Sequence, residues 1–346
     1  LRRVFGASEV ALVDSGTSAL AMAMRATTRA GGVIALPAYA CVDVGAAALF
    51  AQLRVRLYDI DPATLSPDLD SVARVLAEGA STIVVSHLYG YPADVPGVAA
   101  LAAMHGARVI EDAAQGAFGS ISGIRLGAFG PLSVLSFGRG KGMTGGGGGA
   151  LLGIGARPED SLTFAHARLA RARSGARTLA VTAAQWALGR PALYALPSAI
   201  PALHLGETIY HPAQEPRAIS AVSASLVRDA LARAEGDLAV RTRNAERLER
   251  AAERVRGVRT VHAIDGGRPG YLRYPLRVDD ARGARAELGV VRGYPDTLAE
   301  LAELRDSLIG DEKISGAREL QRTLVTLPTH ARVSERDLRD LTTWLG

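Results

Sequence analysis

The first 160 residues alternate short apolar runs with helical patterns, and this alternation restricts the fold more than any other feature of the chain. We predict strands where apolar residues run together between turn-forming residues, at residues 10–13, 33–36, 55–58, 82–86, 108–111 and 132–137. Helices are predicted between them, at residues 19–25, 44–51, 69–77 and 98–105. Strands that alternate with helices predict an α/β domain with a mostly parallel sheet, in which functional residues gather where the strands end.

The pattern changes after about residue 160. Helical sequence rich in alanine and arginine comes first, and a polar, proline-bearing stretch leads to a long predicted helix over residues 220–256. A smaller α+β unit follows, with predicted strands near residues 260–262, 271–278 and 323–327. We therefore expect a large domain over residues 1–215, in which residues 160–215 form a helical insertion or connection, and a second part over residues 216–346 that holds the long helix and the small C-terminal domain.

Composition and charge argue against several classes of protein. The net charge is +5 at pH 7, but the arginines are scattered along helical stretches and no aromatic-and-basic RNA motif occurs, so we expect no nucleic-acid partner. No stretch reaches the roughly 18 uninterrupted apolar residues of a membrane-spanning helix, and no signal peptide is found. Cys41 is the only cysteine, which excludes an internal disulfide and a cysteine-rich zinc site and favours the cytoplasm. We expect no metal site. Because the chain begins with Leu1, we expect native residues before it.

The basic residues are almost all arginine, since only Lys141 and Lys313 among the 40 are lysine. A lysine amine can lose its proton and attack a carbonyl group, whereas an arginine guanidinium stays protonated in proteins. Lys313 ends a polar run, Gly310-Asp311-Glu312-Lys313, and we interpret it as a solvated surface residue. Lys141 lies in a glycine-rich turn after a predicted strand, which makes it a candidate nucleophile.

Two motifs at predicted strand ends suit a charged ligand. Ser15-Gly16-Thr17 stands between a strand and a helix, where glycine allows close approach and the N–H groups at the helix start attract an anion. Asp112 follows a buried strand in Glu111-Asp112-Ala113-Ala114-Gln115, and its carboxylate can keep a nearby ring nitrogen protonated. Each motif alone is also compatible with an ordinary helix cap.

Two further motifs follow strands in the same domain. Ser136 lies near a strand end, and Lys141 follows in Gly138-Arg139-Gly140-Lys141, where its amine can form a Schiff base with an aldehyde. This segment is not a P-loop, because Leu135 and Gly142 stand where that motif requires Gly and Ser or Thr. The fourth motif offers a surface for a flat ring, although a plain turn also explains it: Pro37-Ala38-Tyr39-Ala40-Cys41.

Together the four motifs supply an anion site, a carboxylate for a pyridinium nitrogen, an amine for an aldehyde and a wall for an aromatic ring. Pyridoxal 5'-phosphate needs this combination, because the protein anchors the cofactor and tunes its electronic properties. All four motifs lie at strand ends of one domain, so their joint occurrence is more specific than any one of them. We therefore predict a pyridoxal 5'-phosphate site.

The same motifs resemble those of the DegT/DnrJ/EryC1/StrS family of pyridoxal-phosphate-dependent sugar aminotransferases. Two more motifs contribute to the resemblance, His87-Leu88-Tyr89-Gly90-Tyr91-Pro92-Ala93-Asp94 and Leu327-Pro328-Thr329-His330. The resemblance is strongest over residues 10–152 and weak between about residues 160 and 260. It implies the α/β fold type I of these transferases, with a mostly parallel central sheet, a smaller C-terminal α+β domain and a homodimer whose site lies at the subunit interface.

The resemblance also implies a role for each matching residue. Lys141 corresponds to the lysine that forms the Schiff base and transfers a proton, and Asp112 to the partner of the pyridinium nitrogen. Gln115 corresponds to the residue that contacts the 3-hydroxyl group of the cofactor, and Ala114 to the one that packs on a ring face. The phosphate ligands that the resemblance implies are Gly16, Thr17 and Ser136.

Three features depart from the family pattern. The aromatic residue that usually stacks on the cofactor corresponds to Cys41, so either Cys41 or Tyr39 is expected to cover that face. Gly145 and Gly147 replace a Thr and a Glu and leave a run of five glycines, which we expect to be mobile. The family places an Asn of the neighbouring subunit on the phosphate. This chain has Glu215-Pro216-Arg217 there, and we hypothesise that Arg217 reaches across the dimer instead.

These inferences predict an aminotransferase that moves an amino group from an amino acid, with glutamate as the expected donor, to a keto sugar linked to a nucleotide. The presence of Lys141 supports transamination, because family members with His in its place catalyse dehydration. A cyclitol or another small ketone of a natural-product pathway is an alternative acceptor, since fold and cofactor do not determine the substrate. A third alternative is a non-catalytic member that binds pyridoxal phosphate.

Overall fold

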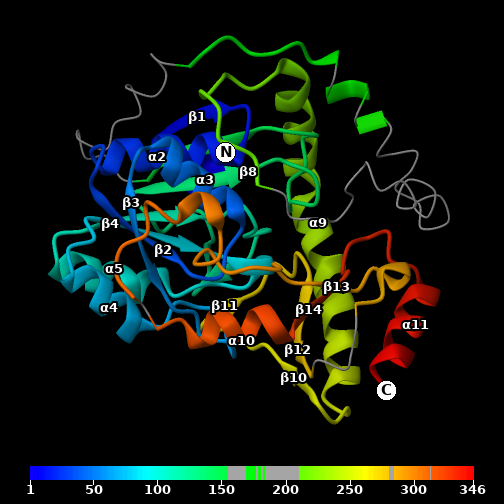
Figure 1. The fold of residues 1–346 in the computed structure, drawn as a ribbon. Helices are drawn as coiled ribbons and strands as arrows, with labels where there is room; N and C mark the ends of the chain where they lie inside the picture. Colours follow the sequence, from blue (N-terminus) through cyan, green and yellow to red (C-terminus); the bar gives the residue numbers. More distant parts are fainter. Residues whose placement is uncertain (155–168, 177, 181, 184–209, 280–283, 312) are drawn as a thin grey trace.

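The computed structural model describes residues 1–154, 169–176, 178–180, 182–183, 210–279, 284–311 and 313–346. A seven-stranded sheet forms the centre of the N-terminal part, with the order β1-β9-β8-β5-β4-β2-β3 (Figure 1). Its strands are β1 (Glu9–Val13), β2 (Val33–Pro37), β3 (Arg54–Tyr58), β4 (Thr82–Ser86), β5 (Arg108–Asp112), β8 (Leu132–Ser136) and β9 (Gly149–Gly153).

Strand direction places most strand ends at one edge of this sheet. β2, β3, β4, β5 and β8 pair in parallel, while β9 runs antiparallel to both of its neighbours, β8 and β1. β1 therefore points the same way as β8, and all strands except β9 have their carboxyl ends at a common edge. The predicted mostly parallel sheet is confirmed.

Helices connect the strands and cover the sheet. They are α2 (Gly16–Thr27), α3 (Val42–Phe50), α4 (Leu69–Ala77) and α5 (Val95–Met104), with a short α1 (Arg2–Phe5) before β1 and a single 3-10 turn, η1 (Leu88–Gly90), after β4. Side chains cap three of them, because Ser15, Asp68 and Asp94 each accept a hydrogen bond from a backbone N–H of the first turn. The predictions for β4 and α4 match the observed bounds, whereas α2 extends beyond the predicted residues 19–25.

The sequence did not predict β9. The glycine run of residues 145–149 predicts a mobile loop, but its last member, Gly149, begins β9 and is buried. Gly149 is required by the packing of this strand, since a Cβ there would lie 2.5 Å from the backbone oxygen of Ser15. The neighbouring Gly148 accepts a hydrogen bond from the Phe137 N–H at 2.8 Å.

The long helix α9 (Ala221–Ala252) connects the two parts of the molecule (Figure 1). Its N-terminal half packs through Val227 and Ala234 on residues of β8 and β9, and its C-terminal half packs through Leu248 on the second sheet. That sheet is antiparallel, with the order β10-β12-β14-β13, and its strands are β10 (Val258–Thr260), β12 (Tyr274–Val278), β14 (Leu324–Leu327) and β13 (Val291–Arg292).

The remaining described elements join these units. A three-stranded sheet ties the two parts together, because β11 (Gly267–Arg268) pairs with β6 (Ser120–Ile121), which pairs with β7 (Ile124–Arg125). Further helices are η4 (Ala286–Leu288), η5 (Ala302–Leu304), α10 (Ser315–Thr323) and α11 (Glu335–Leu345). The strand predicted at residues 260–262 ends at Thr260, and most of the expected insertion at residues 160–215 lies outside the described residues.

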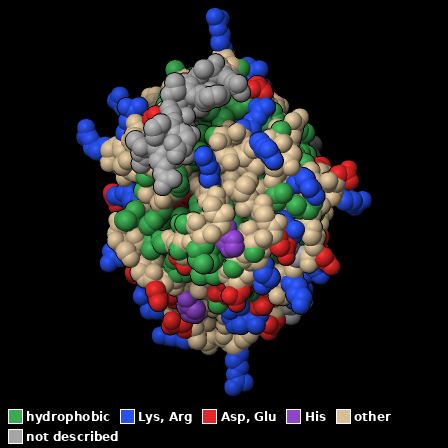
Figure 2. Space-filling model, turned by 90° about the vertical axis from the view of Figure 1, so that its left-hand side faces the viewer, with side chains coloured by type: hydrophobic (Ala, Val, Ile, Leu, Met, Phe, Trp, Pro, Cys, Tyr) green, Lys and Arg blue, Asp and Glu red, His purple; other side chains and the backbone are tan. Residues whose placement is uncertain are grey.

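Two general features of the molecule concern its helices and its surface. Within the described part of the chain, no helix combines the length and the apolar character that crossing a bilayer requires. On the face shown in Figure 2, the Lys and Arg side chains are dispersed around the outline and lie among acidic ones. This distribution favours a solvated basic surface on that face.

Candidate active site

The residues that the sequence singled out come from several elements at one edge of the large sheet. Asp112 ends β5, Ser136 ends β8, and the helix α2 begins at Gly16 after β1. The turn with Lys141 follows β8, and Cys41 follows β2 as the N-cap residue of α3. Because these strand ends share an edge, the fold brings together residues that lie far apart in the sequence.

The start of α2 packs closely against the end of β8. A Cβ on Gly16 would lie 2.8 Å from the Cβ and 3.0 Å from the Oγ of Ser136, so only glycine fits between the two elements without a shift. The Ser15 hydroxyl accepts the N–H of Ser18 at 2.9 Å, while the first N–H groups of the helix, those of Gly16 and Thr17, have no partner within the helix. Gly16, Thr17 and Ser136 together therefore fit an anion-binding role.

Replacing Gly16 with alanine tests this packing. We expect the free energy of unfolding to fall by about 1–3 kcal/mol, because the new methyl group must displace α2 or Ser136. We also expect weaker binding of pyridoxal phosphate. Urea denaturation and equilibrium titration with the cofactor measure the two effects.

The control is Gly236→Ala in α9, where a Cβ meets no atom within 4 Å and alanine should stabilise the helix by about 0.5–1 kcal/mol. Unchanged stability and affinity in Gly16→Ala would contradict the packing argument.

Asp112 is a half-buried carboxylate with two protein donors. Its Oδ1 accepts the N–H of Ala114 and its Oδ2 accepts the hydroxyl of Ser86, each at 3.0 Å. Burial raises the pKa of Asp112, although these hydrogen bonds and the charge of Lys141 act in the opposite direction. A positive charge beside this buried carboxyl group would stabilise its ionised form, and a protonated ring nitrogen would supply such a charge.

Lys141 lies close enough to act electrostatically on both Asp112 and Cys41. Burial raises the pKa of the Cys41 thiol to about 12, and the nearby Lys141 charge opposes that rise. Cys41 is half-buried, whereas the alternative residue, Tyr39, has no exposed surface. The Tyr39 hydroxyl accepts the N–H of Tyr294 at 2.8 Å, and the two rings pack with centroids 5.4 Å apart. The geometry therefore favours Cys41 as the residue available to a ligand beside Lys141.

Gln115 is held by two tyrosines that the sequence did not single out for the site. Its Oε1 accepts the backbone N–H of Tyr89 at 2.8 Å, and its Nε2 donates to the Tyr294 hydroxyl at 2.6 Å. The rings of Tyr89 and Tyr294 stack with centroids 5.8 Å apart. Tyr89 belongs to a motif that resembles the family, but Tyr294 comes from the C-terminal part, 179 residues from Gln115, and lies in no recognisable motif.

Tyr294→Phe tests whether this contact matters to the site. The variant keeps the ring and removes the acceptor of Gln115, so we expect the affinity for pyridoxal phosphate to fall by about three- to tenfold. Equilibrium titration of the cofactor-free protein measures the affinity. Tyr274→Phe is the control, because the buried Tyr274 hydroxyl makes no hydrogen bond among the described residues. Equal affinity in the two variants would argue against a role for Tyr294.

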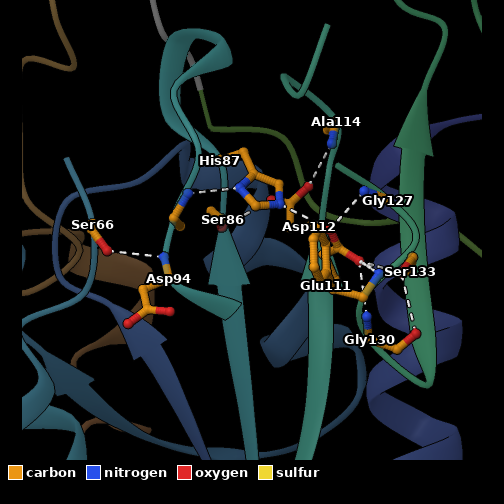
Figure 3. A network of polar contacts seen from close by, with 12 residues as sticks. Ser66, Ser86, His87, Asp94, Glu111, Asp112, Ala114, Gly127, Gly130 and Ser133 are labelled. Atoms are coloured by element: carbon orange, nitrogen blue, oxygen red, sulfur yellow. Dashed lines mark hydrogen bonds and ion pairs between the residues drawn. The ribbon is translucent and has the colours of Figure 1, made fainter. Parts of the chain in front are cut away.

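Next to Asp112, a second carboxylate is fully buried in a network of donors (Figure 3). Glu111 Oε1 accepts from His87 Nε2 and the Gly127 N–H, while Oε2 accepts from Phe129 N–H, Gly130 N–H and Ser133 Oγ. Burial opposes ionisation, but the hydrogen bonds outweigh it and hold the pKa of Glu111 below its ordinary value of 4.5. Donors of the protein thus satisfy the Glu111 carboxylate, whereas the Asp112 carboxylate can accept a further hydrogen bond from a ligand.

Arg217 lies beside the start of α2 in its own chain. Its N–H donates to Asp14 Oδ1 at 3.3 Å, its carbonyl accepts the Asp14 N–H at 2.9 Å, and its Nη1 donates to the carbonyl of Arg171 at 3.4 Å. A role across a dimer stays a prediction. Among the described residues no group of three or more His, Cys, Asp and Glu side chains is arranged to hold a metal ion.

The residues present fit pyridoxal phosphate. Gly16 allows the start of α2 to approach Ser136 so closely that a Cβ would lie 2.8 Å from the Ser136 Cβ, which brings the helix N–H groups and the Ser136 hydroxyl together. Burial destabilises the ionised form of Asp112, and the cationic ring nitrogen of the cofactor would stabilise that form. Lys141 is the amine near it, and Cys41 is the accessible side chain near Lys141.

Comparisons with known proteins relate part of the chain to a family of aminotransferases. Residues 1–168 match the model of the DegT/DnrJ/EryC1/StrS aminotransferase family, which confirms the resemblance for that segment. A UDP-N-acetyl-3-dehydro-alpha-D-glucosamine 3-aminotransferase of Acidithiobacillus ferrooxidans is 33% identical over 139 residues, which are 40% of this chain and 38% of that protein. An L-glutamine:2-deoxy-scyllo-inosose aminotransferase of Streptomyces lividus is 34% identical over 139 residues, 40% of this chain and 33% of that protein. These matches therefore span less than half of each relative.

The fold has close structural neighbours. A DegT DnrJ EryC1 StrS aminotransferase from Brucella abortus superposes with a TM-score of 0.77 at 20% identity, covering 99% of this chain and 87% of the other. This likeness extends over both parts of the molecule, beyond the segment that the family model matches, and confirms the predicted fold class with its smaller C-terminal domain.

Proposed function

We propose, from the match of residues 1–168 to the model of the DegT/DnrJ/EryC1/StrS aminotransferase family, that the chain is a pyridoxal-phosphate-dependent aminotransferase acting on a keto sugar. The observation that carries the proposal is the meeting of Asp112, Lys141 and the Gly16–Ser136 contact at one sheet edge. A carboxylate, an amine and an anion site in this arrangement match the ring nitrogen, the aldehyde and the phosphate of the cofactor.

Each of these residues has a distinct task in the proposal. The N–H groups of Gly16 and Thr17 and the Ser136 hydroxyl hold the phosphate, and Asp112 holds the protonated ring nitrogen. Ala114 and Cys41 cover the ring faces. When bound, pyridoxal phosphate supplies the electron sink that allows an amino group to move between an amino acid and a ketone.

Lys141 is the proposed base. Its Nζ takes the proton from the α-carbon of the amino donor and returns one to the carbon that becomes aminated. Asp112 remains fixed during this exchange, because Ser86 and Ala114 hold one carboxylate oxygen each. Gln115, clamped between Tyr89 and Tyr294, is the proposed contact for the 3-hydroxyl group.

The names of the relatives define two classes of acceptor. The Acidithiobacillus protein is named for a nucleotide-linked keto sugar and the Streptomyces protein for a cyclitol, with L-glutamine as the donor. We propose a nucleotide-linked keto sugar as the acceptor and glutamate as the donor, with a cyclitol acceptor as the second candidate. We further propose a cytoplasmic homodimer, in which Arg217 approaches the phosphate of the partner subunit.

One assay tests the activity and separates the two acceptors. The protein is loaded with pyridoxal phosphate and incubated with glutamate or glutamine and with a panel of keto sugar nucleotides and cyclitol ketones. Formation of 2-oxoglutarate or its amide together with an aminated sugar nucleotide supports the proposal. Amination of the cyclitols alone would favour the second candidate, and a protein that binds the cofactor but aminates nothing would be a non-catalytic binder.

A further inference from the structure

Ser86 is a buried residue at the end of β4 and lies beside Asp112. The two residues are direct partners in the parallel pairing of β4 and β5, and Ser86 is 7% exposed. The Ser86 hydroxyl donates to Asp112 Oδ2 at 3.0 Å. It is the one side-chain donor among the described residues that bonds to the Asp112 carboxyl group, since the other donor is the backbone N–H of Ala114.

The position of Ser86 is held by the residue that follows it (Figure 3). The His87 N–H donates to the backbone oxygen of Asp112 at 3.1 Å. The imidazole accepts the Ala93 N–H on Nδ1 at 3.0 Å, which places the ring proton on Nε2, and Nε2 donates to Glu111 Oε1 at 2.9 Å. Because both ring nitrogens are engaged and the pair is fully buried, the end of β4 has little freedom to move relative to β5.

We propose that Ser86 is a positioning residue of this site: its hydroxyl orients the Asp112 carboxylate toward the ring nitrogen of the cofactor and favours the ionised form of that carboxylate. The Ser86 and Ala114 bonds occupy one lone pair on each oxygen, which leaves capacity for a third donor from the ligand side. The inference rests on the proposed function for the identity of that donor, but the Ser86–Asp112 contact itself does not depend on it.

Other groups also act on Asp112, so the effect of Ser86 must be separated from theirs. Lys141 approaches from the turn after β8, and His87 from the end of β4. Cys41 at the start of α3 and Tyr58 at the end of β3 also interact electrostatically with it. Changing only Ser86 leaves these four groups in place.

The experiment measures the Asp112 titration in the cofactor-free protein by side-chain ¹³C NMR, with the resonance assigned by its loss in Asp112→Asn. In Ser86→Ala the ionised carboxylate loses a donor, so the titration midpoint is expected to rise by about one pH unit. Ser86→Thr and Ser86→Val form a matched pair of nearly equal volume that differ in the hydroxyl group. The Thr variant should keep the wild-type midpoint, and the Val variant should show the rise.

Cofactor affinity provides the second measurement. Ser86→Ala and Ser86→Val should bind pyridoxal phosphate about tenfold more weakly than the wild type and Ser86→Thr. An unchanged Asp112 midpoint in both Ala and Val variants would overturn the proposal. A raised midpoint with unchanged cofactor affinity would overturn the positioning role. A wild type that binds no cofactor would refute the proposed function instead, while the NMR titration would still decide whether Ser86 governs Asp112.

Discussion

Replacing Lys141 with alanine is expected to abolish amino transfer, with kcat falling by roughly 10⁴-fold or more. The variant removes the only amine in the glycine-rich turn after β8, near Asp112 and Cys41. Steady-state assays measure the rate. Borohydride reduction of the wild type followed by peptide mass spectrometry should find the cofactor attached to Lys141 and should find no attachment in the variant.

Two controls separate amine chemistry from charge. Lys141→Arg keeps a cation near Asp112 but cannot supply an unprotonated amine, so it should be as inactive as the alanine variant while retaining more cofactor affinity. Lys313→Ala changes the only other lysine of the chain, which is exposed, and should leave the rate within about twofold of wild type. Substantial activity in Lys141→Arg, or attachment of the cofactor to Lys313, would contradict the assignment.

The edge at which the site lies can be predicted from the sequence, because parallel strands place their carboxyl ends together. β4 ends at Ser86 as predicted, β5 ends one residue later than predicted, at Asp112, and β8 one residue earlier, at Ser136. Shifts of one residue leave the motifs at the ends of the strands. The predicted location of the site at this edge of the sheet is therefore unaffected.

Two parts of the site were not predictable because their causes are tertiary. The glycines before β9 resemble a loop, and the need for glycine at position 149 comes from the backbone of Ser15, far away in the sequence. Tyr294 has no motif around it and reaches Gln115 only because the C-terminal part packs beside the 3-10 turn that holds Tyr89. No local pattern reports such contacts.

The adjacent acids Glu111 and Asp112 show the same limit. The sequence assigns a role to Asp112 through the resemblance and leaves Glu111 without one. Successive residues of a strand face opposite sides, which separates the two carboxyl groups. Their different roles follow from the number of donors around each: Glu111 receives five hydrogen bonds and Asp112 receives two.

Glu111→Gln is expected to lower the free energy of unfolding by about 3–5 kcal/mol. An amide cannot replace this carboxylate in either orientation. With its NH₂ group at the Oε1 position, the amide would direct a donor at the Nε2–H of His87 and the N–H of Gly127. With that group at the Oε2 position, it would direct a donor at the N–H groups of Phe129 and Gly130. Urea denaturation of the cofactor-free protein measures the loss, and hydrogen exchange should accelerate at the three backbone amides.

Glu335→Gln is the matched control, because Glu335 pairs with Arg247 on the surface and is 70% exposed. Loss of such a pair should change the free energy of unfolding by about 1 kcal/mol or less. A similarly small change in Glu111→Gln, with unaltered exchange at Gly127, Phe129 and Gly130, would show that the buried network contributes little to stability.

The lowered pKa of Glu111 determines how its contribution to the free energy of unfolding changes with pH. The pKa of Glu111 is lower in the folded protein than its ordinary value of 4.5, because the donors around it favour the ionised form. Its contribution to the free energy of unfolding is therefore fully present above that value and is lost as the pH falls through the lower, folded-state pKa. The stability difference between the wild type and Glu111→Gln should accordingly be constant near neutral pH and shrink under acid conditions. A difference that grew as the pH fell would mean that Glu111 is protonated in the folded protein.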